Sequence, residues 1–260
     1  MQTRNAATFI TSNPVTNIVK DGKPFVYFHT HVITEETLQK AIDAQASIEI
    51  DIAVTADGTH YIGHPLEFYA FKGLPLPNNL PLDEVLDRVY QSGIFLALDC
   101  KDVRALPKIK ELIERFGPNR CQVHAWVDRL LFKPYPLEIT IEPHWGHEDI
   151  LYEKVLELRQ QTGVPLVMAV RGLTQERLRQ EGYQIINKII AAAKGHAESI
   201  YFYLPNFELP PSKLIDELLK NNLVVYFNVD AVPKKQWPQL YHGMTDYIES
   251  ATTFGADRGK

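Results

Sequence analysis

The 260-residue chain is poor in cysteine and contains no long uninterrupted hydrophobic run. Its two cysteines, Cys100 and Cys121, each lie in an apolar segment typical of a strand, which favours buried thiols over a disulfide framework. No window approaches the roughly 18 apolar residues of a transmembrane helix, and MQTRNAATFITSNPV at the N-terminus lacks the apolar core of a signal peptide. We therefore expect a soluble, cytoplasmic protein without a transmembrane segment.

Basic residues are also too few and too scattered to form a nucleic-acid-binding surface. The chain has 27 Lys and Arg residues against 32 Asp and Glu residues, and a net charge of -5 at pH 7. Nucleic-acid binding usually needs a basic patch or stripe, which the sequence does not contain. This composition excludes nucleic acid as an expected partner.

Strand-like segments alternate with helical ones along the chain. The runs rich in β-branched and aromatic residues are 25–30, 47–54, 95–100, 121–126, 137–142, 165–170, 199–204, 223–229 and 245–250. Helical periodicity is clearest in 35–45, 81–93, 105–117, 148–163, 174–195 and 211–222. This alternation predicts an α/β fold of parallel strands joined by crossover helices. At this length we expect one domain, residues 1–260, folded as a (β/α)8 TIM barrel.

A barrel of eight strands leaves one of these nine segments over. We expect the surplus segment to be 121–126 or 137–142, because no helix fits between them. A doubly wound open sheet is the alternative, but no Gly-rich phosphate loop follows an early strand. The Pro-rich segment 74–82 is expected to be a loop.

Three carboxylates lie near the ends of two neighbouring predicted strands. Glu49 and Asp51 share a face of segment 47–54, and Asp99 shares a face with Lys101. Barrel enzymes hold their active sites at the C-terminal ends of the strands. Three carboxylates in one barrel mouth would repel one another unless a cation neutralises them, and all-oxygen ligands favour Mg²⁺ or Ca²⁺ over Zn²⁺. The pattern thus predicts one divalent ion.

Histidines accompany these carboxylates. In FHTHV, residues 28–32, His29 and His31 share one face at the end of the first predicted strand. His64 follows an Asp57-Gly58 turn that reverses the chain, so it can return to the same barrel mouth. These residues alone leave open whether the first histidines bind a metal or transfer protons beside one.

The order His29, Glu49-x-Asp51, Thr55-Ala-Asp57-Gly58, His64 resembles the opening of the phospholipase C-like phosphodiesterase superfamily. That superfamily includes glycerophosphodiester phosphodiesterases, sphingomyelinase D enzymes and the menorin family. The menorin-like branch is the most similar, through GHP (63–65), PLDEVLDRVYQSG (81–93), LALDCKD (96–102) and VPLVMAVRGL (164–173). The resemblance implies a barrel enzyme that uses Mg²⁺ or Ca²⁺ to cleave a glycerophosphodiester or lysophospholipid-like substrate.

The resemblance also implies roles for individual residues. The implied metal ligands are Glu49, Asp51 and Asp99, and the implied catalytic residues are the acid/base pair His29 and His64 together with Lys101, which would neutralise the phosphate. The expected partner is a small phosphodiester, with transient lipid contact if the substrate is a lysophospholipid.

Substrate contacts are expected from residues that end other apolar runs. Thr30 stands where glycerophosphodiesterases carry Arg, and Arg171 is the expected replacement. Asn228 and Trp126 are the other expected substrate-binding residues.

Two other functions fit parts of the sequence. His29-Thr30-His31 also resembles the His-x-His motif of amidohydrolases and of polymerase-and-histidinol-phosphatase-type domains, where both histidines bind Zn²⁺ or a related ion. That site would need His124 or His144 and a late Asp246, and it leaves Glu49, Asp51, His64 and Lys101 without a role. The third hypothesis is a noncatalytic phospholigand-binding barrel. Isolated histidines are usually structural, and we expect this of His31, His124, His144, His147, His196 and His242.

Overall fold

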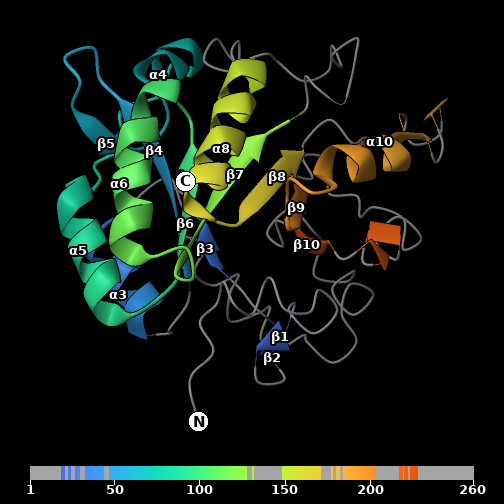
Figure 1. Ribbon diagram of the computed structural model, residues 1–260. Coiled ribbons are helices and arrows are strands. Elements are labelled where there is room, and N and C mark those ends of the chain that lie inside the picture. Colours follow the sequence, from blue (N-terminus) through green and yellow to red (C-terminus); the bar gives the residue numbers. More distant parts are fainter. Residues whose placement is uncertain are drawn as a thin grey trace, which may run out of the picture.

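The computed structural model describes the backbone of residues 19–20, 23–24, 27–29, 33–43, 47–127, 131, 148–170, 177, 180–181, 184–202, 217–218, 220–221 and 223–227 (Figure 1). Within these ranges, no helix is long and apolar enough to cross a membrane.

The centre of the molecule is an eight-stranded sheet. Its strands are β3 (Tyr27–His29), β4 (Ser47–Val54), β5 (His60–Ile62), β6 (Leu96–Cys100), β7 (Cys121–Trp126), β8 (Leu166–Val170), β9 (Ser199–Phe202) and β10 (Val224–Phe227). They lie in the order β10-β9-β8-β7-β6-β4-β3, every pair on this path is parallel, and β5 pairs antiparallel with β4. Parallel strands adjacent in chain order are the arrangement of a (β/α)8 barrel, so the predicted α/β fold is confirmed. The described residues include no pairing between β3 and β10. A short antiparallel pair, β1 (Val19–Lys20) and β2 (Lys23–Pro24), is separate from this sheet.

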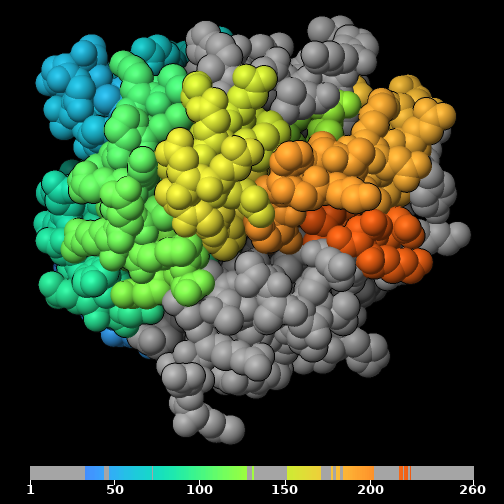
Figure 2. All heavy atoms as spheres, viewed as in Figure 1, coloured from blue at the N-terminus to red at the C-terminus, as the bar shows by residue number. Residues whose placement is uncertain are grey.

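Helices lie between most consecutive strands. They are α3 (Glu35–Asp43), α4 (Leu66–Lys72), α5 (Leu82–Ser92), α6 (Leu106–Phe116), α8 (Glu148–Thr162) and α10 (Gln184–Ala193), with a short 3-10 turn η1 (Val103–Ala105) before α6. All of these α-helices except α4 fall within segments whose periodicity predicts a helix. The helices α6, α8 and α10 cover much of the sheet in the space-filling view of this side, where the β4–β5 hairpin stays visible in blue at the upper left (Figure 2).

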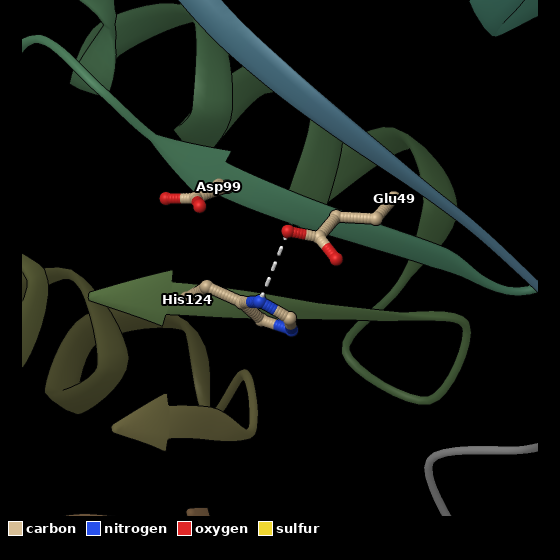
Figure 3. Close-up of side chains that lie close together, drawn as sticks. All are labelled: Glu49, Asp99 and His124. Atoms are coloured by element: carbon tan, nitrogen blue, oxygen red, sulfur yellow. Dashed lines mark ion pairs between the residues drawn. The ribbon is translucent and has the colours of Figure 1, made fainter. Parts of the chain in front are cut away.

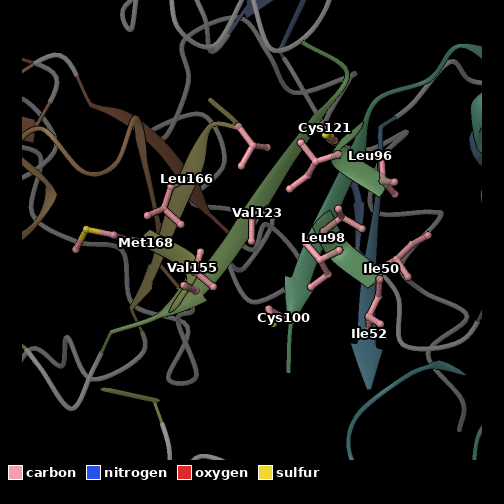
Figure 4. Close-up of a cluster of buried hydrophobic side chains, with 14 of the residues drawn as sticks. Ile50, Ile52, Leu96, Leu98, Cys100, Cys121, Val123, Val155, Leu166 and Met168 are labelled. Carbon is pink, nitrogen blue, oxygen red and sulfur yellow. The ribbon is translucent and has the colours of Figure 1, made fainter. Parts of the chain in front are cut away.

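Alternation along the strands separates two sets of buried side chains. Ile50 and Ile52 of β4 join Leu98 and Cys100 of β6 in the hydrophobic core that packs against the helices (Figure 4). Glu49, Asp51 and Asp99 occupy the alternate positions of these strands, so their side chains point to the opposite face of the sheet. Every residue of β4 is buried. Glu49 and Asp51 therefore do not form a solvated face of an edge strand.

The cysteines and the Pro-rich segment follow the sequence predictions. Cys100 and Cys121 are both buried free thiols, and residues 74–81 contain no helix or strand.

Some elements differ from the sequence predictions. Segment 121–126 is β7, between β6 and β8, so it is an ordinary member of the sheet and not the surplus strand. Segments 137–142 and 245–250 lie outside the described residues. The sequence patterns did not predict β5 or α4, which are 3 and 7 residues long and thus too short for a clear periodicity.

Candidate active site and metal centre

The strand register places the predicted polar residues level with one another. Asp51 of β4 pairs with Asp99 of β6, and Asp99 pairs with His124 of β7. At the other edge of β4, the backbone of His29 pairs with that of Glu49. The side chain of His29 lies outside the described part of the structure. Four neighbouring strands thus meet at the site.

The site is buried and rich in negative charge. Glu49, Asp51 and Asp99 are each 1% exposed, and Lys101 is 7% exposed. Three carboxylates therefore face one ammonium group in a region with almost no solvent. Burial raises the pKa of Asp99, and the charges of Asp51 and Glu49 raise it further, while Lys101 opposes them. An added cation would relieve this repulsion.

Lys101 lies between two of the carboxylates. Its Nζ donates to Asp99 Oδ2 at 2.6 Å and lies 3.4 Å from Asp51 Oδ1. Burial lowers the pKa of Lys101, but Asp51 and Asp99 together outweigh it, so the pKa is raised and the side chain stays cationic at neutral pH. The Nζ also lies 5.3 Å from the centre of the Trp126 ring, within cation–π range. The site thus contains a fixed positive charge.

His64 reaches Asp51 from the turn between β5 and α4. Its Nε2 lies 3.1 Å from Asp51 Oδ2. The ring of Phe68 stacks on the imidazole at a centroid distance of 4.2 Å, and the backbone N–H of His64 donates to Tyr69 Oη at 3.0 Å. Tyr61 Oη donates to the carbonyl oxygen of His64 at 2.7 Å. Residues of β5 and α4 therefore fix both the backbone and the ring of His64.

Gly63 makes this support of His64 sterically possible. Its φ is +137°, and a Cβ at this position would lie 2.6 Å from Tyr69 Oη, the acceptor of the His64 N–H. We expect Gly63→Ala to cost about 1–3 kcal/mol in free energy of unfolding through backbone strain and to lower kcat by displacing His64. Urea unfolding and steady-state kinetics measure the two effects.

Gly73→Ala is the matched control for Gly63→Ala. Gly73 also has a positive φ, +62°, but a Cβ added there would meet no atom within 4 Å. We expect a comparable strain cost and unchanged kcat. Equal losses of kcat in the two variants would contradict the role of Gly63 in placing His64.

A second group of potential ligands lies beside Lys101 and includes a histidine. Glu49, Asp99 and His124 each offer one ligand atom, and these atoms all lie within 4.8 Å of one another (Figure 3). His124 is fully buried, and its Nδ1 lies 3.5 Å from Glu49 Oε1. Asp99 Oδ1 is buried and has no hydrogen-bond partner among the residues that the structure describes. Two carboxylates and an imidazole fit a divalent cation.

This group differs from the ligand set that the sequence implies. Asp51 directs its two oxygens toward Lys101 and His64, whereas His124 lies against Glu49. The pattern of an isolated histidine favoured a structural role for His124. The sequence feature that indicates a role in the site is the two-residue spacing of Gln122, His124 and Trp126, which places their side chains on one face of the strand.

The predicted substrate-binding residues are only partly described. Trp126 lies in the site, where its Nε1 donates to Asp99 Oδ2 at 3.3 Å. Arg171 and Asn228 lie outside the described residues, as do His31, His144 and Asp246. Their predicted roles stay predictions.

No protein-family model matches the chain, and no curated protein matches it. Among solved structures, the chain is similar to a candidate glycerophosphodiester phosphodiesterase from Galdieria sulphuraria. The two share 13% sequence identity at a TM-score of 0.44, over 87% of this chain and 98% of that one. The menorin-like resemblance of the sequence stays a prediction.

Proposed function

We propose that the protein is a metal-dependent phosphodiesterase. The observation that carries this proposal is the convergence of Glu49, Asp51 and Asp99, all buried, around the ammonium of Lys101 and beside the imidazole of His64. Buried charges normally pair with opposite charges or coordinate metals, and these carboxylates outnumber the cation beside them. The cluster therefore has the charge and the donor atoms for a divalent ion and for an anionic substrate.

The proposed ion is Mg²⁺ or Ca²⁺, held by Glu49, Asp51 and Asp99. Oxygen donors suit both ions, and the buried Oδ1 of Asp99 has no hydrogen-bond donor within the described ranges. When bound, a divalent ion stabilises the charge on the nonbridging oxygens of a phosphodiester.

Lys101 is proposed to contribute a second positive charge to the same phosphate. Its pKa is raised by Asp51 and Asp99 against the effect of burial, so it is protonated at neutral pH. A fixed cation in a water-poor site stabilises developing negative charge more strongly than it would in water. Lys101 thus reduces the electrostatic barrier to attack on the anionic diester.

His64 is proposed to protonate the leaving oxygen. Asp51 Oδ2 lies 3.1 Å from its Nε2, and this carboxylate orients the imidazole ring. Phe68 and Tyr69 fix the ring and the backbone, so that the proton is held at a defined place. We assign the complementary base role to His29, whose backbone pairs with Glu49.

Exposed apolar side chains on and after α4, the helix that follows His64, favour a lysophospholipid-like substrate over a water-soluble glycerophosphodiester. Leu66 and Phe71 of α4 are 38% and 51% exposed, and Leu74 and Leu76 after α4 are 52% and 61% exposed. Phe68, between the first two, stacks on His64. An acyl chain beside the site would cover part of this surface.

Hydrolysis assays before and after chelation test the proposed function. The EDTA-treated protein would be assayed against bis(p-nitrophenyl) phosphate, glycerophosphocholine and lysophosphatidylcholine. We expect EDTA to abolish turnover and Mg²⁺ or Ca²⁺ to restore it, because the ion stabilises the transition-state charge. The lower KM is expected for lysophosphatidylcholine.

Other outcomes would favour the competing hypotheses. Tightly bound Zn²⁺ without phosphodiester turnover would favour an amidohydrolase-type site that uses His29 and His31. Phosphodiester binding without turnover, with or without an ion, would favour a noncatalytic phospholigand-binding barrel.

A further inference from the structure

We infer that His124 is a nitrogen ligand of the divalent ion and that Gln122 fixes the tautomer that allows it to bind. This inference rests on the proposed metal site and adds a donor to its three carboxylates. It also changes the expected ion: a mixed nitrogen and oxygen site favours first-row transition ions such as Mn²⁺ and Co²⁺ over Ca²⁺, which prefers oxygen ligands.

The position of His124 fits that of a ligand. The residue lies on β7, level with Asp99 on β6, and is fully buried. Its ligand atom lies within 4.8 Å of one oxygen each of Glu49 and Asp99 (Figure 3). Ligands at about 2.1–2.3 Å from one ion lie roughly 3 to 4.5 Å apart. One ion can therefore join all three side chains after small movements.

The hydrogen bonding of Asp99 is a second, independent observation. Asp99 Oδ2 accepts from Lys101 Nζ at 2.6 Å and from Trp126 Nε1 at 3.3 Å. The other oxygen, Oδ1, is buried and accepts no hydrogen bond from any residue described here. A buried carboxylate oxygen without a donor is costly, and a cation beside it removes that cost. Asp99 Oδ1 is thus available to bind a divalent cation.

Gln122 controls which nitrogen of His124 is available. Its side-chain amide nitrogen lies 2.9 Å from His124 Nε2, and Gln122 is fully buried. In this orientation the amide nitrogen of Gln122 donates to His124 Nε2, so the imidazole proton of His124 lies on Nδ1, toward Glu49. If the amide group turns over, its oxygen accepts from Nε2–H, and Nδ1 presents a lone pair to the ion.

Metal-ligating histidines usually donate their second N–H to an acceptor, as the turned-over amide would allow. Gln122 Oε1 has no hydrogen-bond partner in the described part of the chain. A rotation of the Gln122 amide group therefore breaks no hydrogen bond that this oxygen makes with the described residues. Gln122 is thus a positioning residue for the metal centre.

Electron spin-echo spectroscopy of the Mn²⁺-loaded protein tests this inference without an activity assay. We expect modulation from a directly bound imidazole ¹⁴N in the wild-type protein and its loss in His124→Asn. His196→Asn, which changes a histidine in the turn after α10, is the control and should keep the signal. Mn²⁺ bound without ¹⁴N modulation, or modulation that persists in His124→Asn, would overturn the inference and leave the proposed function standing. Failure of the wild-type protein to bind any divalent ion would overturn both.

Two variants of Gln122 test the tautomer. Gln122→Met removes the acceptor and should weaken Mn²⁺ binding about 10- to 100-fold, whereas Gln122→Glu keeps an acceptor and should retain both the affinity and the ¹⁴N signal. Equal affinities in Gln122→Met and in the wild-type protein would overturn the role of Gln122. Circular dichroism identifies any variant that does not fold.

Discussion

We expect His64→Ala and His29→Ala each to lower kcat toward glycerophosphocholine by about two to four orders of magnitude, while the protein still binds its divalent ion. General acid–base catalysis contributes an effect of this size. The ion should be retained because its proposed ligands, the three carboxylates and His124, include neither His64 nor His29. Steady-state kinetics and an ion titration of each variant measure the two effects.

The leaving group supplies a control for the role of His64. p-Nitrophenolate leaves without protonation, whereas the alkoxide of a glycerophosphodiester does not. His64→Ala should therefore lose much less activity toward bis(p-nitrophenyl) phosphate than toward glycerophosphocholine. Equal losses on both substrates would contradict His64 as the general acid. Loss of the ion in His29→Ala would instead favour the amidohydrolase-type site.

We expect Lys101→Met to destabilise the metal-free protein by about 3–5 kcal/mol, the usual effect of removing one partner of a buried ion pair. The ammonium lies 2.6 Å from Asp99 Oδ2 and 3.4 Å from Asp51 Oδ1, and all three groups are buried. A bound divalent ion should restore part of this stability, because it neutralises the same carboxylates. The loss of a charge beside the phosphate should also lower kcat about 100-fold. Urea unfolding in EDTA and in excess Mg²⁺ measures the stability, and steady-state kinetics measures kcat.

Lys154→Met is the matched control for Lys101→Met. Lys154 pairs with Glu157 on the exposed side of α8, and such pairs contribute less than about 1 kcal/mol. We expect a small loss of stability that Mg²⁺ does not restore. A similarly small loss in Lys101→Met, or no restoration by the ion, would show that Lys101 and the ion do not share these carboxylates.

Much of the fold follows from local patterns in the sequence. Alternation of strand-like and helical segments predicted the order of the elements, because each connection in a parallel α/β fold is a local crossover. The alternation in SIEIDIAV also placed Glu49 and Asp51 on one face. It could not decide between a half-exposed strand and one buried on both faces, because that depends on what packs against each face.

The site was harder to predict where it depends on contacts between strands. The pairing of Asp99 with His124 follows from the register of β6 and β7, which distant packing sets. The direction of Asp51 toward His64 and Lys101, and of His124 toward Glu49, depends on side-chain geometry that no spacing rule contains. The support of His64 comes from β5 and α4, which are too short to show a pattern.

A calorimetric titration of the EDTA-treated protein with Mg²⁺ and Mn²⁺ tests the buried metal site most directly. We predict one ion per wild-type chain, with binding lost in Glu49→Gln, which keeps the shape of the side chain and removes its charge. Glu67→Gln, a change on the exposed first turn of α4, should bind the ion as the wild-type protein does. Absence of binding in the wild-type protein, or unchanged binding in Glu49→Gln, would contradict a metal site formed by these carboxylates.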